Sequence, residues 1–277
     1  MSKGIDVSNT LRPSLSLVMP AYNEEAGIQT VLAEAYEALT SLEIPFEILV
    51  VDDGSTDRTS TLVEQASGIR PTIRLLRHSE NRGYGAALRT GFEAARFDLV
   101  AFTDADGQFY LEDLEPLVER SARYPVVVGF RIDRQDSWRR RFYSWGYNKL
   151  VRFLLKTGVR DCDCALKVFR REALAYLLPE TNGFLVNAEM LSRARRLGLP
   201  VAEVGVRHRA RRHGSSKVSL LDIPRTLAKL LPLWWAQANH RKGSVQSVPF
   251  PPLSHKLPLP VHSSRQSTNY PDARKSA

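Results

Sequence analysis

The feature that most constrains the fold of this 277-residue chain is an alternation of apolar and amphipathic segments between residues 15 and 102. Four apolar runs have the length of buried strands, and the segments between them carry apolar side chains at helical spacing. The runs lie at 15–20, 46–51, 73–76 and 98–102, and the helical segments at 28–39, after residue 57, and at 83–95. Strands that alternate with helices build βαβ units, so the sequence predicts an α/β fold with a mostly parallel central sheet flanked by helices.

The remainder of the chain divides into a second half of the same domain and a polar tail. Beyond residue 110 we expect helices at 111–123, 145–155, 173–178, 187–197 and 220–238, and strands at 126–129, 165–169 and 201–204. Residues 241–277 are rich in Pro and Ser with little aliphatic periodicity, which indicates disorder. The expected organisation is a flexible arm at 1–13, one domain at 14–218, an amphipathic helix at 219–240 and a disordered tail at 241–277.

Polar loops follow the predicted strands at the point where each strand ends. Ligands of open parallel sheets bind beyond the carboxyl ends of the strands, where such loops meet. The loops are residues 22–24, 52–55, 81–85 and 104–108. We therefore expect a binding site along this edge of the sheet.

Two carboxylates, those of Asp104 and Asp106, follow the predicted strand 98–102 directly. In an extended chain residues i and i+2 point to the same side, so both carboxylates can converge on one point, with the Gln108 carbonyl close behind. Two like charges held together are costly unless a cation lies between them. The predicted occupant is Mg²⁺ or Mn²⁺, which prefers oxygen ligands and also binds diphosphates, although an acidic turn would use the same residues.

The chain is basic, with a formal net charge of +9 and a pI near 9.7, which indicates anionic partners. No base-stacking or groove-reading motif accompanies this charge, so we predict no nucleic-acid partner. The two cysteines, Cys162 and Cys164, are spaced for a poor disulfide, which favours a reducing compartment. No signal peptide and no apolar run of membrane-spanning length is visible, and we expect a cytoplasmic protein.

The predicted helix at 219–237 favours contact with a membrane surface. Its apolar stripe consists of Ile223, Leu227, Leu230, Leu231 and Trp234. Tryptophan near the end of such a helix suits the membrane–water interface. We expect the protein to associate peripherally with the inner face of the membrane, and a helix packed on the domain is the alternative.

Seven motifs occur in order between residues 14 and 220. They are VMPAYNEE at 18–25, ILVVDDGSTD at 48–57, NRGYGAA at 81–87, DADGQ at 104–108, VGFR at 128–131, DCALKVFR at 163–170 and RRHGSSK at 211–217. Together they resemble the motifs of family-2 glycosyltransferases, above all those of the polyprenyl-phosphate (dolichol-phosphate) sugar synthases. The resemblance implies the GT-A fold and inverting transfer of a sugar from a nucleotide-diphosphate sugar donor.

The resemblance also implies roles for individual residues. Those that would bind the nucleotide sugar are Pro20, Tyr22, Glu24, Val51, Asp53, Asp104, Asp106 and Lys217. The metal ligands would be Asp104, Asp106 and Gln108. The groups expected to act in catalysis are Asp106, Arg131 and Arg211, and those expected at the acceptor phosphate are Arg131, Arg140 and Ser216. Solvated basic faces are the alternative for the arginine-rich runs at 139–141 and 207–212.

The acceptor is predicted from the chemistry that it requires. A hydroxyl acceptor needs a general base, whereas a lipid phosphate is already an anion and needs cations to hold it. Family-2 enzymes that act on hydroxyls carry a Glu-Asp pair on the acceptor side, but here residues 187–190 read NAEM, with arginines following. We therefore expect transfer of a hexose, from a donor of the GDP-mannose or UDP-glucose type, to a polyprenyl phosphate.

Two other functions stay open at this point. One is a soluble family-2 glycosyltransferase that acts on a hydroxyl of a glycan or secondary metabolite. The other is a non-catalytic basic protein that binds a membrane surface or a nucleotide. The sequence does not indicate the donor base, the sugar or the oligomeric state.

Overall fold

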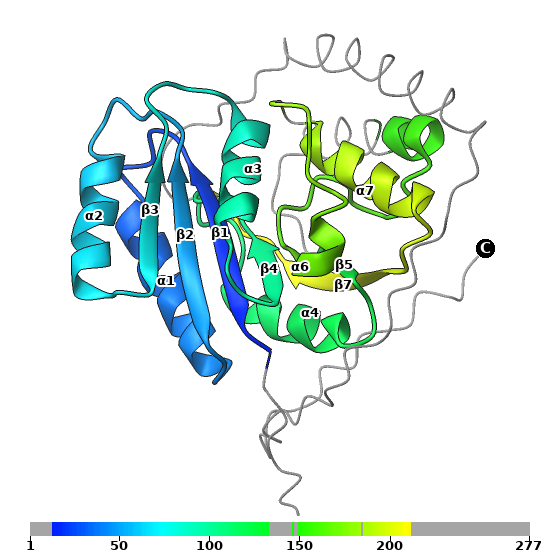
Figure 1. The fold of residues 1–277 in the computed structure, drawn as a ribbon, viewed down its shortest axis with the longest axis horizontal. Coiled ribbons are helices and arrows are strands. Elements are labelled where there is room, and N and C mark those ends of the chain that lie inside the picture. Colours follow the sequence, from blue (N-terminus) through cyan, green and yellow to red (C-terminus); the bar gives the residue numbers. More distant parts are fainter. Residues whose placement is uncertain (1–12, 133–145, 147–148, 184, 212–277) are drawn as a thin grey trace, which may run out of the picture.

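The computed structural model describes residues 13–132, 146, 149–183 and 185–211, and its centre is a seven-stranded sheet (Figure 1). The strand order is β3-β2-β1-β4-β6-β5-β7, in which β6 runs antiparallel to both of its neighbours and the remaining pairs are parallel. The strands are β1 (Leu15–Ala21), β2 (Phe46–Asp52), β3 (Ile73–Arg77), β4 (Leu99–Phe102), β5 (Val126–Ile132), β6 (Lys167–Arg170) and β7 (Val201–Arg207). The predicted α/β fold with a mostly parallel sheet is confirmed.

Helices cover both faces of this sheet. In Figure 1, α3 lies in front of β1 and β2, whereas α1 lies behind the sheet and packs against α2. The helical elements are α1 (Ile28–Ser41), α2 (Thr59–Ile69), α3 (Tyr84–Ala94), the 3₁₀ turn η1 (Leu111–Asp113), α4 (Leu114–Ser121), α6 (Arg171–Leu174) and α7 (Val186–Arg196). Residues 149–155 are also helical, in agreement with the part of the predicted helix 145–155 that is described.

The central strands are apolar because both of their faces are covered. All seven residues of β1 are buried, as expected of a parallel strand between two layers of helices. One polar ladder crosses the sheet near the start of the strands: Ser16 Oγ donates to Glu47 (2.8 Å), and Arg74 Nη1 donates to the same carboxylate (2.6 Å). These bonds satisfy the buried Glu47 carboxylate and fix the register of β1, β2 and β3.

The second half of the sheet is joined to the first by aromatic packing between β4 and β6. The rings of Phe102 and Phe169 stack with centroids 6.3 Å apart, and Phe92 of α3 meets both edge-on. Next to them, the buried Arg170 donates to the carbonyls of Ser121 and Ala122 at the end of α4. An arginine in this place satisfies carbonyls that the helix itself leaves open.

Several predicted boundaries differ from the observed ones for physical reasons. Strands β5 and β7 are longer than predicted because they pair with each other along their whole length, from Val126–Val201 to Ile132–Arg207. The helix predicted at 111–123 is a 3₁₀ turn followed by α4, and Pro116, which lacks an N–H, lies in the first turn of α4. Strand β6 begins two residues later than predicted, at Lys167.

Part of the predicted organisation lies outside the described residues. This applies to the arm up to residue 12, the helix at 219–240 and the tail at 241–277, and the domain boundaries therefore stay predictions. Within the described part of the chain, no helix is long and apolar enough to cross a bilayer.

Candidate active site

The carboxyl ends of β1, β2 and β4 meet at one edge of the sheet. Ala21, the last residue of β1, is the register partner of Asp52 at the end of β2, and Phe102 of β4 pairs with Val18. The predicted contacts Pro20 and Val51 are register partners on the same edge, and both are buried. The loops that follow these strands are therefore held side by side, as the sequence predicts.

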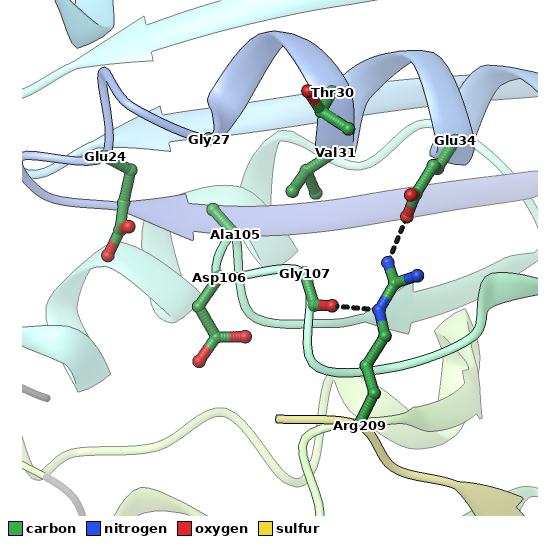
Figure 2. Close-up of a pocket in the computed structure, with 9 residues that line it drawn as sticks. All are labelled: Glu24, Gly27, Thr30, Val31, Glu34, Ala105, Asp106, Gly107 and Arg209. Carbon is green, nitrogen blue, oxygen red and sulfur yellow. Dashed lines mark hydrogen bonds and ion pairs between the residues drawn. The ribbon is translucent and has the colours of Figure 1, made fainter. Parts of the chain in front are cut away.

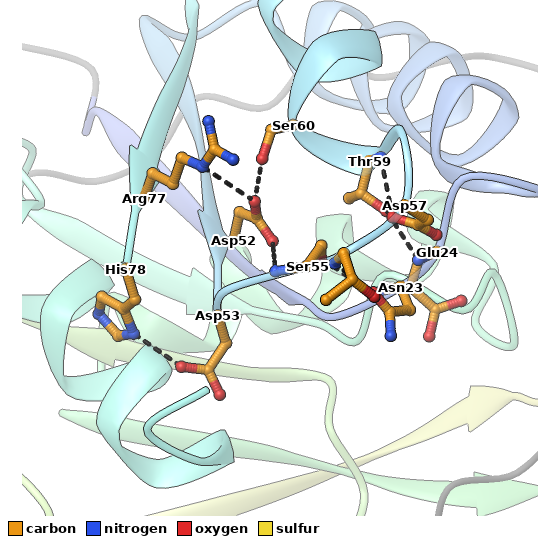
Figure 3. Close-up of polar contacts among 11 residues, drawn as sticks. Asn23, Glu24, Asp52, Asp53, Ser55, Asp57, Thr59, Ser60, Arg77 and His78 are labelled. Atoms are coloured by element: carbon orange, nitrogen blue, oxygen red, sulfur yellow. Dashed lines mark hydrogen bonds and ion pairs between the residues drawn. The ribbon is translucent and has the colours of Figure 1, made fainter. Parts of the chain in front are cut away.

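The first two loops interlock through polar side chains (Figure 3). Asn23, which has a φ of 51°, receives a bond from Thr56 N–H at its Oδ1 (2.8 Å) and donates its own N–H to Ser55 Oγ (2.9 Å). Glu24 N–H donates to Thr59 Oγ1 (2.8 Å) at the start of α2. The neighbouring Tyr22 is half-buried. The backbone at 22–24 is therefore rigid, and its side chains are presented at the sheet edge.

Asp52 and Asp53 organise the next loops. The fully buried Asp52 accepts the N–H of Ser55 (3.0 Å) and the hydroxyl of Ser60 (Figure 3). Asp53 accepts the N–H groups of Arg82 (2.9 Å) and Gly83 (2.8 Å) and lies 2.7 Å from His78 Nδ1. Asp53 thus holds the loop that leads into α3, and its contact with the nucleotide sugar stays a prediction.

The two glycines of the NRGYG motif permit close contact between the start of α3 and the loop at 179–183. Gly85 N–H donates to the carbonyl of Asn182 (2.9 Å), and a Cβ on Gly85 would lie 2.0 Å from the carbonyl oxygen of Thr181. Gly83 has a φ of 97°, and a Cβ there would lie 2.5 Å from the Asn182 carbonyl oxygen. Since the Gly85 N–H is bonded to the protein itself, these glycines allow α3 to pack closely on the loop at 179–183.

Replacing Gly85 with Ala is expected to destabilise the fold by about 2 kcal/mol, because overpacking against rigid backbone forces the 179–183 loop away from α3. The measurement is urea denaturation followed by circular dichroism. The control is Gly68→Ala in α2, where a Cβ meets nothing within 4 Å and the helix should gain about 0.5–1 kcal/mol. Equal stability of the two variants would contradict this account of the motif.

The acidic motif lies directly after β4, and its two carboxylates influence each other. Burial, and next the charge of Asp106, raise the pKa of Asp104 from its ordinary value to about 7. Tyr84 donates its hydroxyl to Asp104 Oδ1 (2.8 Å), and Asp106 Oδ1 accepts the N–H of Gln108 (3.1 Å). The two carboxylates are therefore near enough for the charge of Asp106 to act on Asp104, and their joint role as metal ligands stays a prediction.

A segment at 208–211 lies across the acidic turn. The N–H of Arg209 donates to the carbonyl of Gln108 (2.9 Å), and Gln108 Nε2 donates to the carbonyl of Arg209 (3.3 Å). The buried guanidinium of Arg209 bonds the Gly107 carbonyl (2.5 Å) and the carboxylate of Glu34 on α1. Figure 2 shows the two contacts of the Arg209 guanidinium in a pocket between α1 and the turn, with Glu24 and Asp106 on its other side. The Gln108 backbone carbonyl is thus engaged, whereas the side-chain oxygen lies outside these bonds.

The donor set suits a divalent cation shared with a diphosphate. The described residues contain no group of three or more His, Cys, Asp or Glu side chains that could hold a metal ion among themselves. Mg²⁺ and Mn²⁺ sites that also bind phosphates need only one or two carboxylates from the protein. The raised pKa of Asp104 is the direction expected of two close, partly buried carboxylates that a cation would stabilise.

Two of the predicted arginines are bonded to carboxylates of the protein. Arg131 Nε and Nη2 form a bidentate pair with Asp161 (2.6 and 2.8 Å); burial alone would lower the pKa of Arg131, but Asp161 outweighs it and raises the value. Arg211 Nη2 bonds both oxygens of Glu24 (2.5 and 2.7 Å). Both arginines are thus held by partners that the sequence did not indicate, and their predicted roles stay predictions. Arg140, Ser216 and Lys217 lie outside the described residues.

The buried Lys167 is a site-forming residue that sequence reasoning missed. Its Nζ donates to the carbonyls of Cys162 and Cys164 and to Asn187 Oδ1 (3.0 Å), and its charge acts on Asp104. The contact fixes the turn that carries Asp161, the partner of Arg131. The sequence does contain one indication of this role, a lysine inside an apolar strand. A lysine buried in this way requires several hydrogen-bond acceptors around it.

Glu189 holds the loop that packs on α3. This buried carboxylate accepts the N–H groups of Glu180 (2.8 Å) and Thr181 (3.0 Å) and the Thr181 hydroxyl (2.8 Å). It also receives a bond from Arg193 Nη2 (3.0 Å). Both of its oxygens are therefore engaged in contacts that fix the loop at 179–183.

Comparison with known proteins identifies the family and the fold. Residues 16–178 match the family described as glycosyl transferase family 2. The glycosyltransferase AglD of Haloferax volcanii is 37% identical over 233 residues, which cover 80% of this chain and 37% of AglD. An undecaprenyl-phosphate 4-deoxy-4-formamido-L-arabinose transferase of Aeromonas hydrophila is 35% identical over 221 residues, or 78% of this chain and 66% of that protein.

A eukaryotic relative is the dolichyl-phosphate beta-glucosyltransferase ALG5A of Trichomonas vaginalis, 34% identical over 69% of this chain and 64% of that protein. The chain thus spans less than two thirds of the length of these relatives. Among solved structures, glucosyl-3-phosphoglycerate synthase of Mycobacterium tuberculosis with Mn²⁺, UDP-glucose and phosphoglyceric acid has a TM-score of 0.64. It is 25% identical and covers 81% of this chain and 80% of its own.

The same synthase with Mg²⁺ and UDP has a TM-score of 0.61 at 24% identity and covers 80% of this chain and 79% of its own. The shared architecture is the GT-A fold, which the sequence motifs predict. The family match covers more than half of the chain and includes the loops after β1, β2 and β4. The chain belongs to glycosyl transferase family 2.

Proposed function

We propose that this glycosyltransferase moves a hexose from a nucleotide-diphosphate sugar to a polyprenyl phosphate, with inversion at the anomeric carbon. Relatives named as undecaprenyl-phosphate and dolichyl-phosphate transferases support this acceptor class. The donor would be of the GDP-mannose or UDP-glucose type. A solved neighbour binds UDP-glucose, which supports a nucleotide-sugar site at this sheet edge without deciding the base.

The observation that carries the proposal is the engagement of Glu189. Hydroxyl acceptors need a carboxylate free to take a proton, and Glu189 is the carboxylate in the part of the sequence where hydroxyl-specific relatives carry one. Its oxygens instead accept two backbone N–H groups, a hydroxyl and the Arg193 guanidinium. A phosphate acceptor, which arrives ionised, makes no demand for such a base.

On the donor side, Asp104, Asp106 and the side-chain oxygen of Gln108 would hold Mg²⁺ or Mn²⁺. When bound, such an ion neutralises the charge that develops on the departing diphosphate. The residues of the chain position the donor: Pro20, Tyr22, Glu24, Val51 and Asp53 form the edge on which the nucleoside would lie. Lys217, with Ser216, would close over it from the segment after residue 211.

On the acceptor side, Arg131 is the group proposed to hold the lipid phosphate, with Arg140 and Ser216. The bidentate bond to Asp161 fixes the guanidinium plane of Arg131 and leaves its Nη1 group outside that pair. A positioned, permanently charged guanidinium suits a phosphate oxygen. Arg211 is proposed to bind the diphosphate. To do so, its guanidinium has to leave the Glu24 carboxylate.

Replacing either arginine with Ala is expected to reduce kcat/KM by about tenfold to a hundredfold, the loss typical of one charge-assisted contact. Arg131→Ala should mainly raise the KM for the lipid phosphate, and Arg211→Ala should mainly affect the donor. Steady-state kinetics with each substrate varied in turn measures both. The assignment of the two arginines is wrong if both variants keep wild-type kcat/KM for donor and acceptor.

The proposed place of action is the cytoplasmic side of the membrane, with the protein bound peripherally. Support comes from the lipid-linked acceptors in the names of the relatives and from the net charge of +9. The amphipathic segment at 219–240, which is proposed to lie on the membrane, is outside the described residues. Flotation of the full chain with anionic vesicles tests this association.

The decisive experiment is a donor screen with Mg²⁺ or Mn²⁺ and a short polyprenyl phosphate, with the product identified by mass spectrometry. A mass increase of one hexose on the lipid phosphate is the expected result. Parallel reactions with a free polyprenol and with soluble glycans test the hydroxyl-acceptor alternative. Transfer to those acceptors alone would overturn the proposal.

A further inference from the structure

Tyr84 links the start of α3 to the acidic motif. Its phenolic oxygen lies 2.8 Å from Asp104 Oδ1 and donates the hydrogen bond, since an ionised carboxylate only accepts. The phenol therefore fixes one oxygen of the first carboxylate of the motif.

The position of Tyr84 is itself fixed by the backbone around it. Gly83 donates its N–H to Asp53, and Gly85 donates its N–H to the Asn182 carbonyl. Tyr84 lies between these two anchored residues and begins α3. The backbone that carries the phenol is therefore fixed, and the hydroxyl reaches across the sheet edge to the loop after β4.

We propose that Tyr84 is a positioning residue for the donor site: it holds Oδ1 of Asp104 so that the other oxygen is presented to the cation bound by the diphosphate. This inference rests on the proposed function. The hydroxyl would act through Asp104. Loss of a hydrogen bond that orients a metal-binding side chain typically lowers the affinity for the metal by about tenfold or more.

The test is Tyr84→Phe, which removes only the hydroxyl. Mn²⁺ binding in the presence of UDP or GDP is followed by electron paramagnetic resonance, and nucleotide binding by calorimetry, with Mn²⁺ and with EDTA. We expect Mn²⁺–nucleotide affinity to fall about tenfold, and metal-free nucleotide affinity to stay unchanged. Tyr176→Phe, at a tyrosine that is 52% exposed, is the matched control.

The outcomes separate the inference from the proposed function. If the wild-type protein binds neither Mn²⁺–UDP nor Mn²⁺–GDP, the proposed donor site itself fails. If the wild type binds and Tyr84→Phe binds equally well, the positioning role is overturned. An equal loss with Mn²⁺ and with EDTA, measured where both proteins are folded, would show a merely structural role and overturn it as well.

Discussion

Replacing Asp106 with Asn is expected to lower kcat/KM by about three orders of magnitude while leaving the fold intact. The loss follows because one of two carboxylates that would hold the cation becomes neutral, and a preorganised charge at the diphosphate is worth this much. The fold should tolerate the change, since Asn can still accept the N–H of Gln108 at Oδ1. The metal-free variant should even be slightly more stable, because Asp104 loses a repulsive neighbour.

Two measurements check this prediction. Steady-state kinetics with the donor varied gives the change in kcat/KM. Thermal unfolding with Mn²⁺ and UDP or GDP gives the stabilisation of the fold by ligand, which should vanish in the variant. The control is Asp98→Asn, at an exposed carboxylate that precedes β4 and therefore lies at the opposite end of the strand. Full activity of Asp106→Asn would show that the acidic motif is only a turn.

The fold and the position of the site were predictable because both depend on local patterns. Apolar runs alternating with helical spacing define the parallel half of the sheet, and the carboxyl-end rule then brings together the loops after β1, β2 and β4. The antiparallel β6 was not predictable in this way. Its direction depends on pairing with both β4 and β5, which the order of elements along the chain does not reveal.

The partners of the site residues were beyond sequence reasoning because they are distant in the chain. Arg209 and Glu34 are 175 residues apart, and Arg211 and Glu24 are 187 apart. Sequence reasoning identified a basic run at 207–212 but had no means to tell which of its members is buried. Tyr84 was read as one residue of a motif, and its hydroxyl contact depends on the conformation of Gly83.

Replacing Glu189 with Gln is expected to destabilise the protein by about 3 kcal/mol and to leave turnover of the folded enzyme within a few-fold of wild type. The carboxylate receives two backbone N–H bonds, one hydroxyl bond and the Arg193 guanidinium, all of which favour a negative charge. Gln presents one oxygen and an amide that cannot accept, so buried donors lose their partner. Urea denaturation measures the stability, and kinetics at low temperature measures the folded enzyme.

The same substitution decides between the two acceptor classes. Loss of a general base typically lowers kcat by a factor of 10² to 10⁴ with little change in stability. Loss of a structural carboxylate instead lowers the stability with little change in kcat. Gly183→Ala, where a Cβ meets nothing within 4 Å, is a control for disturbance of the same loop. A thousandfold loss of kcat in a stably folded Glu189→Gln variant would assign Glu189 as a base and point to a hydroxyl acceptor. Lost stability with retained turnover would support binding of the acceptor by arginines, as a phosphate acceptor requires.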